Sequence, residues 1–307
     1  MRPGSGGRLL GLARLLLAML PAASFPGPTV GIVIRIGVLT PHDVPGPEVE
    51  FAAMAPGRLT VRVARVTGTT GPGGGGGPVS PAELGPLTTA PLLDRAAERL
   101  VTEPVDVIGY ASTTSAYTTG FDAEMAMVVR LSQLTGRPVA ATCASAVRAL
   151  HVLQVERIAL VGAPWFAPEF NELGAAYFAN QGFGIVSSAS AGLSHDRRAV
   201  EPAAVCEWVS RHVVDTAQAV FIGGNGFRAA GAIEALETAI GRPVLTSNQV
   251  LLWQLLAQVD AAFEVRGHGR LFAHKLCGSS ATSGPWTSAP RPRRPVRPFA
   301  TAAPTRA

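Results

Sequence analysis

The sequence predicts an α/β fold of two pseudo-symmetric halves, each a parallel sheet covered by helices, with a cleft between them. From residue 92 onward, apolar strands alternate with amphipathic helices, which is typical of parallel sheets with helices on both faces. The tetrapeptide Gly-Arg-Pro-Val at 136–139 recurs at 241–244, each time after a helix and before a polar turn. A helix-capping Gly and a strand-starting Pro could also converge by chance, but we favour an internal duplication. With 307 residues, 47% of them hydrophobic, the chain can bury a sizeable core.

The first strand is predicted over the apolar run 31–39, which stops at the polar segment 40–43. Residues 59–66 alternate between apolar and polar side chains and form the second predicted strand. Residues 67–78 contain five consecutive glycines but lack the Lys-Ser/Thr pair of a phosphate-binding loop. We therefore interpret this segment as a surface insertion loop.

The alternation of helix and strand then continues in chain order. A helix is predicted over 92–100, a strand over 105–110, an amphipathic helix over 123–134 that Gly136 stops, and a further strand from 137. Later strands are predicted near 158–161, 185–188, 219–223 and 243–246, with a helix over 203–213. The two-halved unit is expected to span 29–275. Ligands bind beyond the carboxyl ends of parallel strands, so the strand-end loops of both halves should converge on the cleft.

Residues 1–28 precede this unit and have two interpretations. Basic residues and the apolar run 9–20 are typical of a signal peptide, which residues 1–24 would form in an exported protein. Because Arg14 interrupts the run, we favour an Ala/Leu-rich extension and a cytoplasmic protein. The run is too short to span a membrane, so no membrane partner is expected.

The segment 276–307 is rich in Ser, Pro, Thr and Arg, and we predict a disordered, basic tail. Four of its arginines account for most of the net charge of +5. A charge confined to a tail is weak evidence for a polyanionic ligand, so no nucleic-acid partner is expected. The sequence leaves open whether the protein forms a homo-oligomer.

The cysteines Cys143, Cys206 and Cys277 lie far apart and form no metal-binding or disulfide pattern, which favours a reducing compartment. Cys206 falls in a predicted helix and is expected in the core. Neither a Gly-x-Ser-x-Gly elbow nor a dinucleotide-binding fingerprint is present, since 223–226 lacks the third glycine. We therefore expect no metal and no cofactor.

Three strand-end loops carry hydroxyl, carboxamide and backbone N–H donors that suit a carboxylate or enediolate oxygen. They cover 111–115, 223–226 and 246–248. The candidate substrate-binding residues are Thr113, Thr114, Asn225, Gly226 and Asn248. The alternative is that these side chains only cap helices, as Ser, Thr and Asn do in most proteins.

Two residues are candidate proton donors. His42 precedes Asp43 in the loop after the first strand, where such a pair serves either proton exchange or turn formation. Cys143 follows a later strand and is either a reactive thiol or a packing residue. Glu48 and Glu50 lie near His42 in sequence and are expected to be solvated.

Four segments in one order resemble the maleate isomerase and arylmalonate decarboxylase branch of the aspartate/glutamate racemase superfamily. They are Arg-Ile-Gly-Val-Leu-Thr-Pro at 35–41, Val-Ile-Gly-Tyr-Ala-Ser-Thr-Thr-Ser at 107–115, the stretch 220–228, and Pro-Val-Leu-Thr-Ser-Asn-Gln at 243–249. The ending at 267–272 also fits. The resemblance implies cofactor-free chemistry on a small carboxylate or dicarboxylate held between two halves.

The isomerases and racemases of this superfamily use one cysteine from each half, and the decarboxylase uses only the second. Here Ser112 matches the first position and Gly224 the second, so neither thiol is present. Thr113, Thr114 and Asn248 match carboxylate-binding positions. The cleft tyrosine has no clear counterpart, because 163–166 occupies that region.

The resemblance and the missing thiols together predict an enzyme that acts α to the carboxylate of a small (di)carboxylic acid, with Ser112 and either His42 or Cys143 as catalytic residues. A serine without an evident activating base cannot replace a thiolate, so decarboxylase or lyase chemistry is favoured over two-thiol racemisation. A non-catalytic carboxylate-binding or regulatory protein and a variant maleate cis-trans isomerase are the alternatives.

Overall fold

A computed structural model describes residues 33–66, 81–196, 199–274 and 276, which belong to one compact unit. The predicted extension (1–28), insertion loop (67–78) and tail (276–307, apart from Leu276) lie outside the described residues. Within the described ranges, no helix is long and apolar enough to cross a bilayer.

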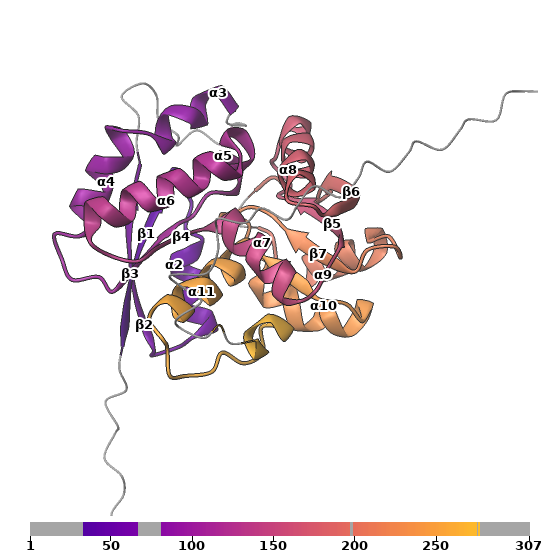
Figure 1. The fold of residues 1–307 in the computed structure, drawn as a ribbon. Coiled ribbons are helices and arrows are strands. Elements are labelled where there is room, and N and C mark those ends of the chain that lie inside the picture. The colour runs from indigo at the N-terminus through magenta and orange to yellow at the C-terminus, as the bar shows by residue number, and fades with distance from the viewer. Residues whose placement is uncertain (1–32, 67–80, 197–198, 275, 277–307) are drawn as a thin grey trace, which may run out of the picture. The chain divides into compact units, whose positions relative to one another are not determined.

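Two four-stranded parallel sheets form the centre of the two halves (Figure 1). The first contains β1 (Ile34–Thr40), β2 (Leu59–Arg65), β3 (Val107–Tyr110) and β4 (Val139–Ala141), in the order β2-β1-β3-β4. The second contains β5 (Arg157–Gly162), β6 (Gly184–Ser190), β7 (Ala219–Ile222) and β8 (Val244–Thr246), in the order β6-β5-β7-β8. Because every strand pair is parallel and the two orders are equivalent, the predicted fold of two similar halves is confirmed.

Helices follow nearly every strand. The first half contains α2 (Pro47–Met54), α3 (Pro81–Leu84), the 3-10 helix η1 (Gly85–Thr88), α4 (Leu92–Leu100), α5 (Thr113–Thr119), α6 (Phe121–Thr135) and α7 (Thr142–Val152). The second contains α8 (Pro168–Asn180), α9 (Pro202–His212), η2 (Ala230–Ala232), α10 (Ile233–Ile240), α11 (Ser247–Gln258) and η3 (Arg270–Ala273).

The repeated Gly-Arg-Pro-Val tetrapeptide marks equivalent joints in the two halves. Gly136 ends α6 with φ of 64°, and Gly241 ends α10 with φ of 69°. A left-handed residue at this position favours glycine, and the proline two residues later cannot continue a helix. The strands that follow, β4 and β8, lie at the same edge of their respective sheets.

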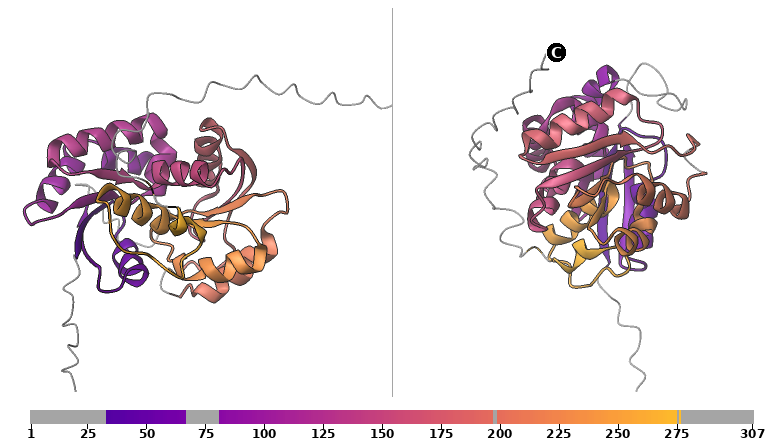
Figure 2. Two further views of the ribbon diagram at one scale, coloured as in Figure 1. Left: turned by 60° about the horizontal axis from the view of Figure 1, so that its bottom comes forward. Right: turned by 90° about the vertical axis from the view of Figure 1, so that its right-hand side faces the viewer.

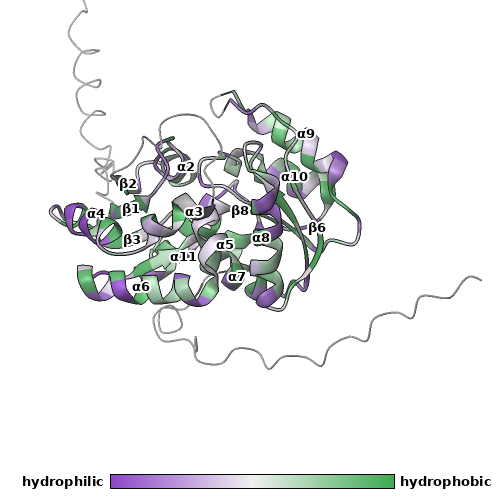
Figure 3. Ribbon diagram, turned by 90° about the horizontal axis from the view of Figure 1, so that it is seen from above, coloured by the Kyte–Doolittle hydropathy of each residue, from purple (hydrophilic) through white to green (hydrophobic). Residues whose placement is uncertain are grey.

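Each half contributes its last helix to the sheet of the other half. Helix α11 packs on β3 and β4 of the first sheet (Figure 2), and its hydrophobic residues are visible in Figure 3. Gly109 allows this close approach, since a Cβ there would lie 3.1 Å from the side chain of Leu255. Conversely, Val147 and Leu150 of α7 share a buried cluster with Phe221 of the second sheet. The exchange joins the two sheets into one packed molecule.

Helix α2 buries Glu50, which the sequence analysis expected to be solvated. Pro47, Glu50, Phe51 and Met54 lie on its buried face, and Glu50 is only 5% exposed. The prediction that Glu50 is solvated is wrong, because its position between Pro47 and Met54 places it on the face that packs inward. Cys206, which was expected in the core, is half-buried and packs against the core cluster.

Candidate active site

The loops that follow β3, β4, β7 and β8 meet where the two halves meet. Asn225, after β7, donates a 3.1 Å hydrogen bond from Nδ2 to Oγ1 of Thr142, the first residue after β4. Thr142 Oγ1 also donates to the carbonyl of Tyr110 at the end of β3. Asn248, after β8, accepts a second bond from Asn225 Nδ2 at 2.9 Å. The structure thus brings the polar loops of both halves to one place.

Ser112 lies beside His42 in this region. The Ser112 Oγ is 3.2 Å from His42 Nε2, and the Ser112 side chain is fully buried. Thr40 holds the two together, because its Oγ1 donates to the carbonyl of Ala111 and accepts the backbone N–H of His42. No activating base for Ser112 was evident from the sequence, whereas the structure places an imidazole against its hydroxyl.

Thr113 and Thr114 follow Ser112 directly in the chain, at the start of α5. Both residues are buried, and within the described part of the chain Thr113 Oγ1 has no hydrogen-bond partner. Thr114 Oγ1 has a 3.5 Å contact with Ser112 Oγ. A buried, unsatisfied hydroxyl costs on the order of 1–3 kcal/mol, which a bound acceptor would offset. Thr113 is therefore the best candidate to bind an oxygen of a ligand.

The carboxamides of Asn225 and Asn248 take part in one hydrogen-bond network. Both N–H groups of Asn225 are used, one by Thr142 and one by Asn248. Asn248 Nδ2 donates to Glu50 Oε2 at 2.7 Å and to the Asn225 carbonyl at 2.9 Å. These bonds fix the loop after β7 and use both side-chain N–H groups of each residue, while substrate binding by Asn225 and Asn248 stays a prediction.

Glu50 anchors this network from the opposite half. Its Oε1 accepts the backbone N–H of Ala230 at 2.6 Å, and its Oε2 accepts the Asn248 amide. Burial raises the pKa of Glu50 to about 7, although these two bonds and the nearby charge of Arg228 act in the opposite direction. The sequence analysis did not recognise Glu50 as a buried residue of the site. The signal that could have found it is its spacing from Pro47, Phe51 and Met54, which places it on the same face of α2.

Glycines shape the loop after β7. Gly224 has φ of +114°, and its N–H donates to Ser247 Oγ at 2.9 Å. A Cβ at Gly224 would lie 3.0 Å from the Cβ of Ala163, so the position that matches the second thiol has little room for a side chain. A Cβ at Gly226 would have its nearest neighbour on Trp165, 3.9 Å away, so space remains there.

Tyr117 also reaches the loop after β7. Its hydroxyl would lie 3.0 Å from a Cβ at Gly223, although Tyr117 belongs to α5 of the first half. Burial raises its pKa well above the ordinary value, so the group stays a neutral phenol. The sequence did not single out this residue, because aromatic side chains in helices are usually core residues.

Cys143 lies beneath the Ser112 loop. Its thiol is fully buried and contacts the Thr113 carbonyl at 3.8 Å, while its backbone N–H donates to Glu124. Burial, with the nearby Glu124, raises the pKa of the Cys143 thiol well above its usual range. Among the described residues, the structure gives this thiol no bond to Ser112 or His42. Of the two predicted proton donors, only His42 is paired with Ser112.

The described part of the chain was also considered for a metal site. No cluster of three His, Cys, Asp or Glu side chains there could hold a metal ion.

A family model described as arylmalonate decarboxylase matches residues 91–272, more than half of the chain. The chain belongs to the arylmalonate decarboxylase family. The match runs from the start of α4 into η3 and includes the loops at Ser112 and Gly224. Family membership supports an enzyme of the maleate isomerase or arylmalonate decarboxylase type.

Comparison with individual proteins gives the same family. A maleate isomerase from Pseudomonas putida is 27% identical over 248 residues, covering 78% of this chain and 97% of the relative. An unliganded arylmalonate decarboxylase structure is similar with a TM-score of 0.65 and 21% identity, covering 78% of this chain and 99% of that one. A maleate cis-trans isomerase from Nocardia farcinica has a TM-score of 0.68 and 20% identity, with coverages of 78% and 98%. At these identities the structural likeness establishes the fold.

Proposed function

We propose that the protein is a cofactor-independent decarboxylase or lyase that acts α to the carboxylate of a small dicarboxylic acid. The observation that carries the proposal is the Thr113 hydroxyl, which is buried and unpartnered among the described residues, one position from Ser112. An unsatisfied donor on the residue that follows Ser112 suits a substrate oxygen that gains negative charge during the reaction.

In this proposal, the hydroxyls of Thr113 and Thr114 hold the carboxylate that remains in the product. As the bond to the other carboxylate breaks, CO2 leaves and the electron pair converts the held group into an enediolate. Hydrogen bonds from two fixed hydroxyls become stronger as this charge develops, which lowers the barrier. Asn225 and Asn248 act indirectly by fixing the opposite wall.

The enediolate then takes a proton at the α-carbon. Ser112 Oγ donates this proton as protonated His42 passes its Nε2 proton to Ser112, so the serine ends as it began and His42 becomes neutral. Geometry favours His42 over Cys143 for this role, since His42 Nε2 is 3.2 Å from Ser112 Oγ whereas the Cys143 thiol is buried against a backbone carbonyl.

The variant maleate cis-trans isomerase is a weaker alternative. Two-thiol chemistry needs a nucleophile from the second half, and Gly224 occupies that position with little space for a side chain. Decarboxylation needs charge stabilisation and one proton delivery, for which the Ser112 loop has suitable groups.

A non-catalytic carboxylate-binding or regulatory protein is the second candidate function. It is favoured by the absence of a thiol at both matched positions, Ser112 and Gly224. Such a protein would keep the Thr113 donor and bind dicarboxylates without changing them.

Proton NMR in heavy water, with the full chain and a panel of 2-methylmalonate, arylmalonates, maleate and amino-acid dicarboxylates, tests the proposal. We expect a monocarboxylate deuterated at the α-carbon, with turnover lowered about 10²-fold or more by Thr113→Val. Ser210→Ala, on the exposed face of α9, is the control for loss of a hydroxyl. Ligand line broadening without any product would contradict catalysis and support the binding protein.

A further inference from the structure

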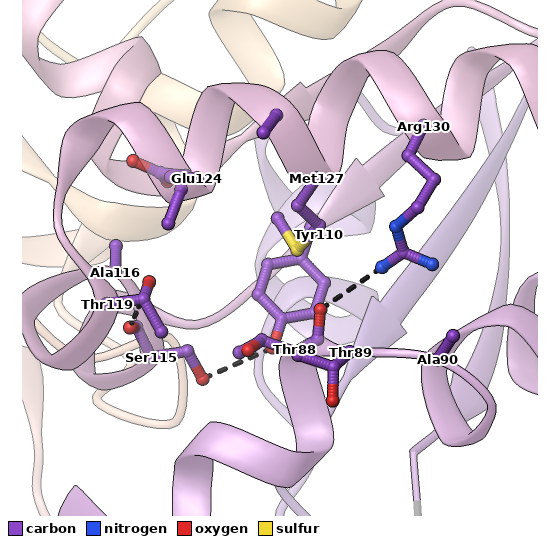
Figure 4. Close-up of a pocket in the computed structure, with 12 residues that line it drawn as sticks. Thr88, Thr89, Ala90, Tyr110, Ser115, Ala116, Thr119, Glu124, Met127 and Arg130 are labelled. Atoms are coloured by element: carbon purple, nitrogen blue, oxygen red, sulfur yellow. Dashed lines mark hydrogen bonds between the residues drawn. The ribbon is translucent and has the colours of Figure 1, made fainter.

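A pocket of about 300 Å³ lies in the first half, between η1, β3, α5 and α6 (Figure 4). Its exposed lining is largely apolar, with alanines and Met127, and the side chains of Tyr110, Ser115, Glu124 and Arg130 also line it. Ala90, Ala123 and Ala126 line it and are exposed, so the pocket is open to solvent. Such a volume accommodates roughly ten water molecules.

A chain of hydrogen bonds leads from this pocket to the candidate active site. The Tyr110 hydroxyl donates to Ser115 Oγ at 3.2 Å (Figure 4). Ser115 Oγ is 2.8 Å from Ser112 Oγ, which in turn is 3.2 Å from His42 Nε2. Three hydroxyls therefore connect the pocket to the imidazole.

Donor and acceptor capacity gives the chain a direction. A hydroxyl has one proton to donate and two lone pairs to accept with. Ser115 accepts from Tyr110, so its own proton is available to Ser112. While His42 is neutral, as it is after a turnover, Ser112 accepts from both the backbone N–H and the hydroxyl of Ser115, and its own proton is left for His42 Nε2. Burial raises the pKa of Tyr110, so its hydroxyl is neutral and carries a proton that it can donate to Ser115.

We propose that Tyr110, Ser115 and Ser112 form a proton relay that returns a proton from pocket water to His42 after each turnover. A water molecule gives a proton to the Tyr110 oxygen while the Tyr110 proton moves to Ser115, that of Ser115 to Ser112, and that of Ser112 to His42 Nε2. Each hydroxyl ends with one proton, and the hydroxide left in the pocket is neutralised by a buffer acid from solvent.

The burial of Ser112 is the reason for such a relay. Its side chain is fully buried even without substrate, so solvent has no direct access to its proton. His42 is half-buried, and a substrate in the cleft would cover it further. The relay rests on the proposed function, because it supplies the proton that this chemistry consumes.

Pre-steady-state kinetics on the full chain, with whichever panel substrate turns over, tests the relay. With Ser115→Ala or Tyr110→Phe, we expect the first turnover at the wild-type rate, later turnovers slowed about tenfold or more, and an unchanged KM. Ser115→Thr, which keeps the hydroxyl, should restore the later turnovers. Ser145→Ala is the matched control, since this buried hydroxyl donates to the Ala141 carbonyl and lies outside the chain.

Equal slowing of first and later turnovers would overturn the relay in favour of a structural role. Unchanged kinetics would also overturn it and show that protons return through the cleft by way of His42. If the wild type turns over nothing, the proposed function fails, and exchange of the His42 Nε2 proton with solvent, followed by NMR, tests the relay alone. We then expect slower exchange in Ser115→Ala but not in Ser145→Ala, and equal exchange in both would overturn the relay.

Discussion

The carboxylate of Glu50 accepts a 2.7 Å hydrogen bond from the side-chain amide of Asn248, although the two residues are 198 positions apart in the chain. The bond joins α2 of the first half to the start of α11 in the second. Since Asn248 also binds the Asn225 carbonyl, the protonation state of one buried carboxylate affects the loop after β7.

Glu50 should make stability depend on pH. Burial raises its pKa to about 7 from an ordinary value of 4.5, so the folded protein binds this proton more tightly than the unfolded chain. The free energy of unfolding should therefore fall as pH rises from about 4.5 to about 7, by up to about 3 kcal/mol from this group. Glu124 acts in the same direction, and half-buried His151, whose pKa is lowered, acts in the opposite one.

Comparison with Glu50→Gln isolates this contribution. Urea unfolding between pH 5 and 8 should show that the free energy of unfolding of the wild type falls relative to that of the variant as pH rises. All other titratable groups are present in both proteins, so their contributions cancel in the difference. Glu48→Gln, two residues away on α2, controls for loss of a charge on this helix. A wild-type minus variant difference that does not change with pH would contradict the account of Glu50.

Gly46 should not tolerate any side chain. A Cβ there would lie 2.0 Å from the carbonyl oxygen of Asn225, the same oxygen that accepts the Asn248 amide. We expect Gly46→Ala to lower the free energy of unfolding by about 1–3 kcal/mol and to weaken dicarboxylate binding. Gly85→Ala is the matched control, since its Cβ would meet no atom within 4 Å. Equal urea midpoints for the two variants would argue against this close contact.

Gly224→Cys should not restore the second thiol of the isomerases. The position combines φ of +114° with a Cβ contact of 3.0 Å to Ala163. Backbone strain of this kind costs about 1–3 kcal/mol, which denaturant unfolding would detect. Ser112→Cys keeps the Cβ already present and should fold normally. A stable Ser112→Cys/Gly224→Cys double variant that converts maleate to fumarate, measured by NMR, would refute this prediction.

Cys143 should be unreactive in the native protein. Its thiol is fully buried and its pKa is raised by that burial, whereas Cys206 is half-buried. With iodoacetamide at neutral pH, peptide mass spectrometry should show Cys206 labelled at least about tenfold faster than Cys143. Rapid labelling of Cys143 would restore it as a candidate proton donor.

The fold was predictable because apolar strand runs and the capping glycines Gly136 and Gly241 are local signals. The site was predictable only in part. Contact between His42 and Ser112 depends on β1 lying beside β3, a strand order that the sequence does not reveal. The role of Glu50 could be recognised only from the packing of α2 against the second half. That both side-chain N–H groups of Asn225 are in use could be recognised only from interatomic distances.

A crystal structure of the full chain with 2-methylmalonate would show whether Thr113 binds the carboxylate of a substrate. We expect a carboxylate oxygen within hydrogen-bond distance of Thr113 Oγ1, with the α-carbon facing Ser112 Oγ. A ligand bound elsewhere, with the Thr113 hydroxyl still unpartnered, would contradict this expectation.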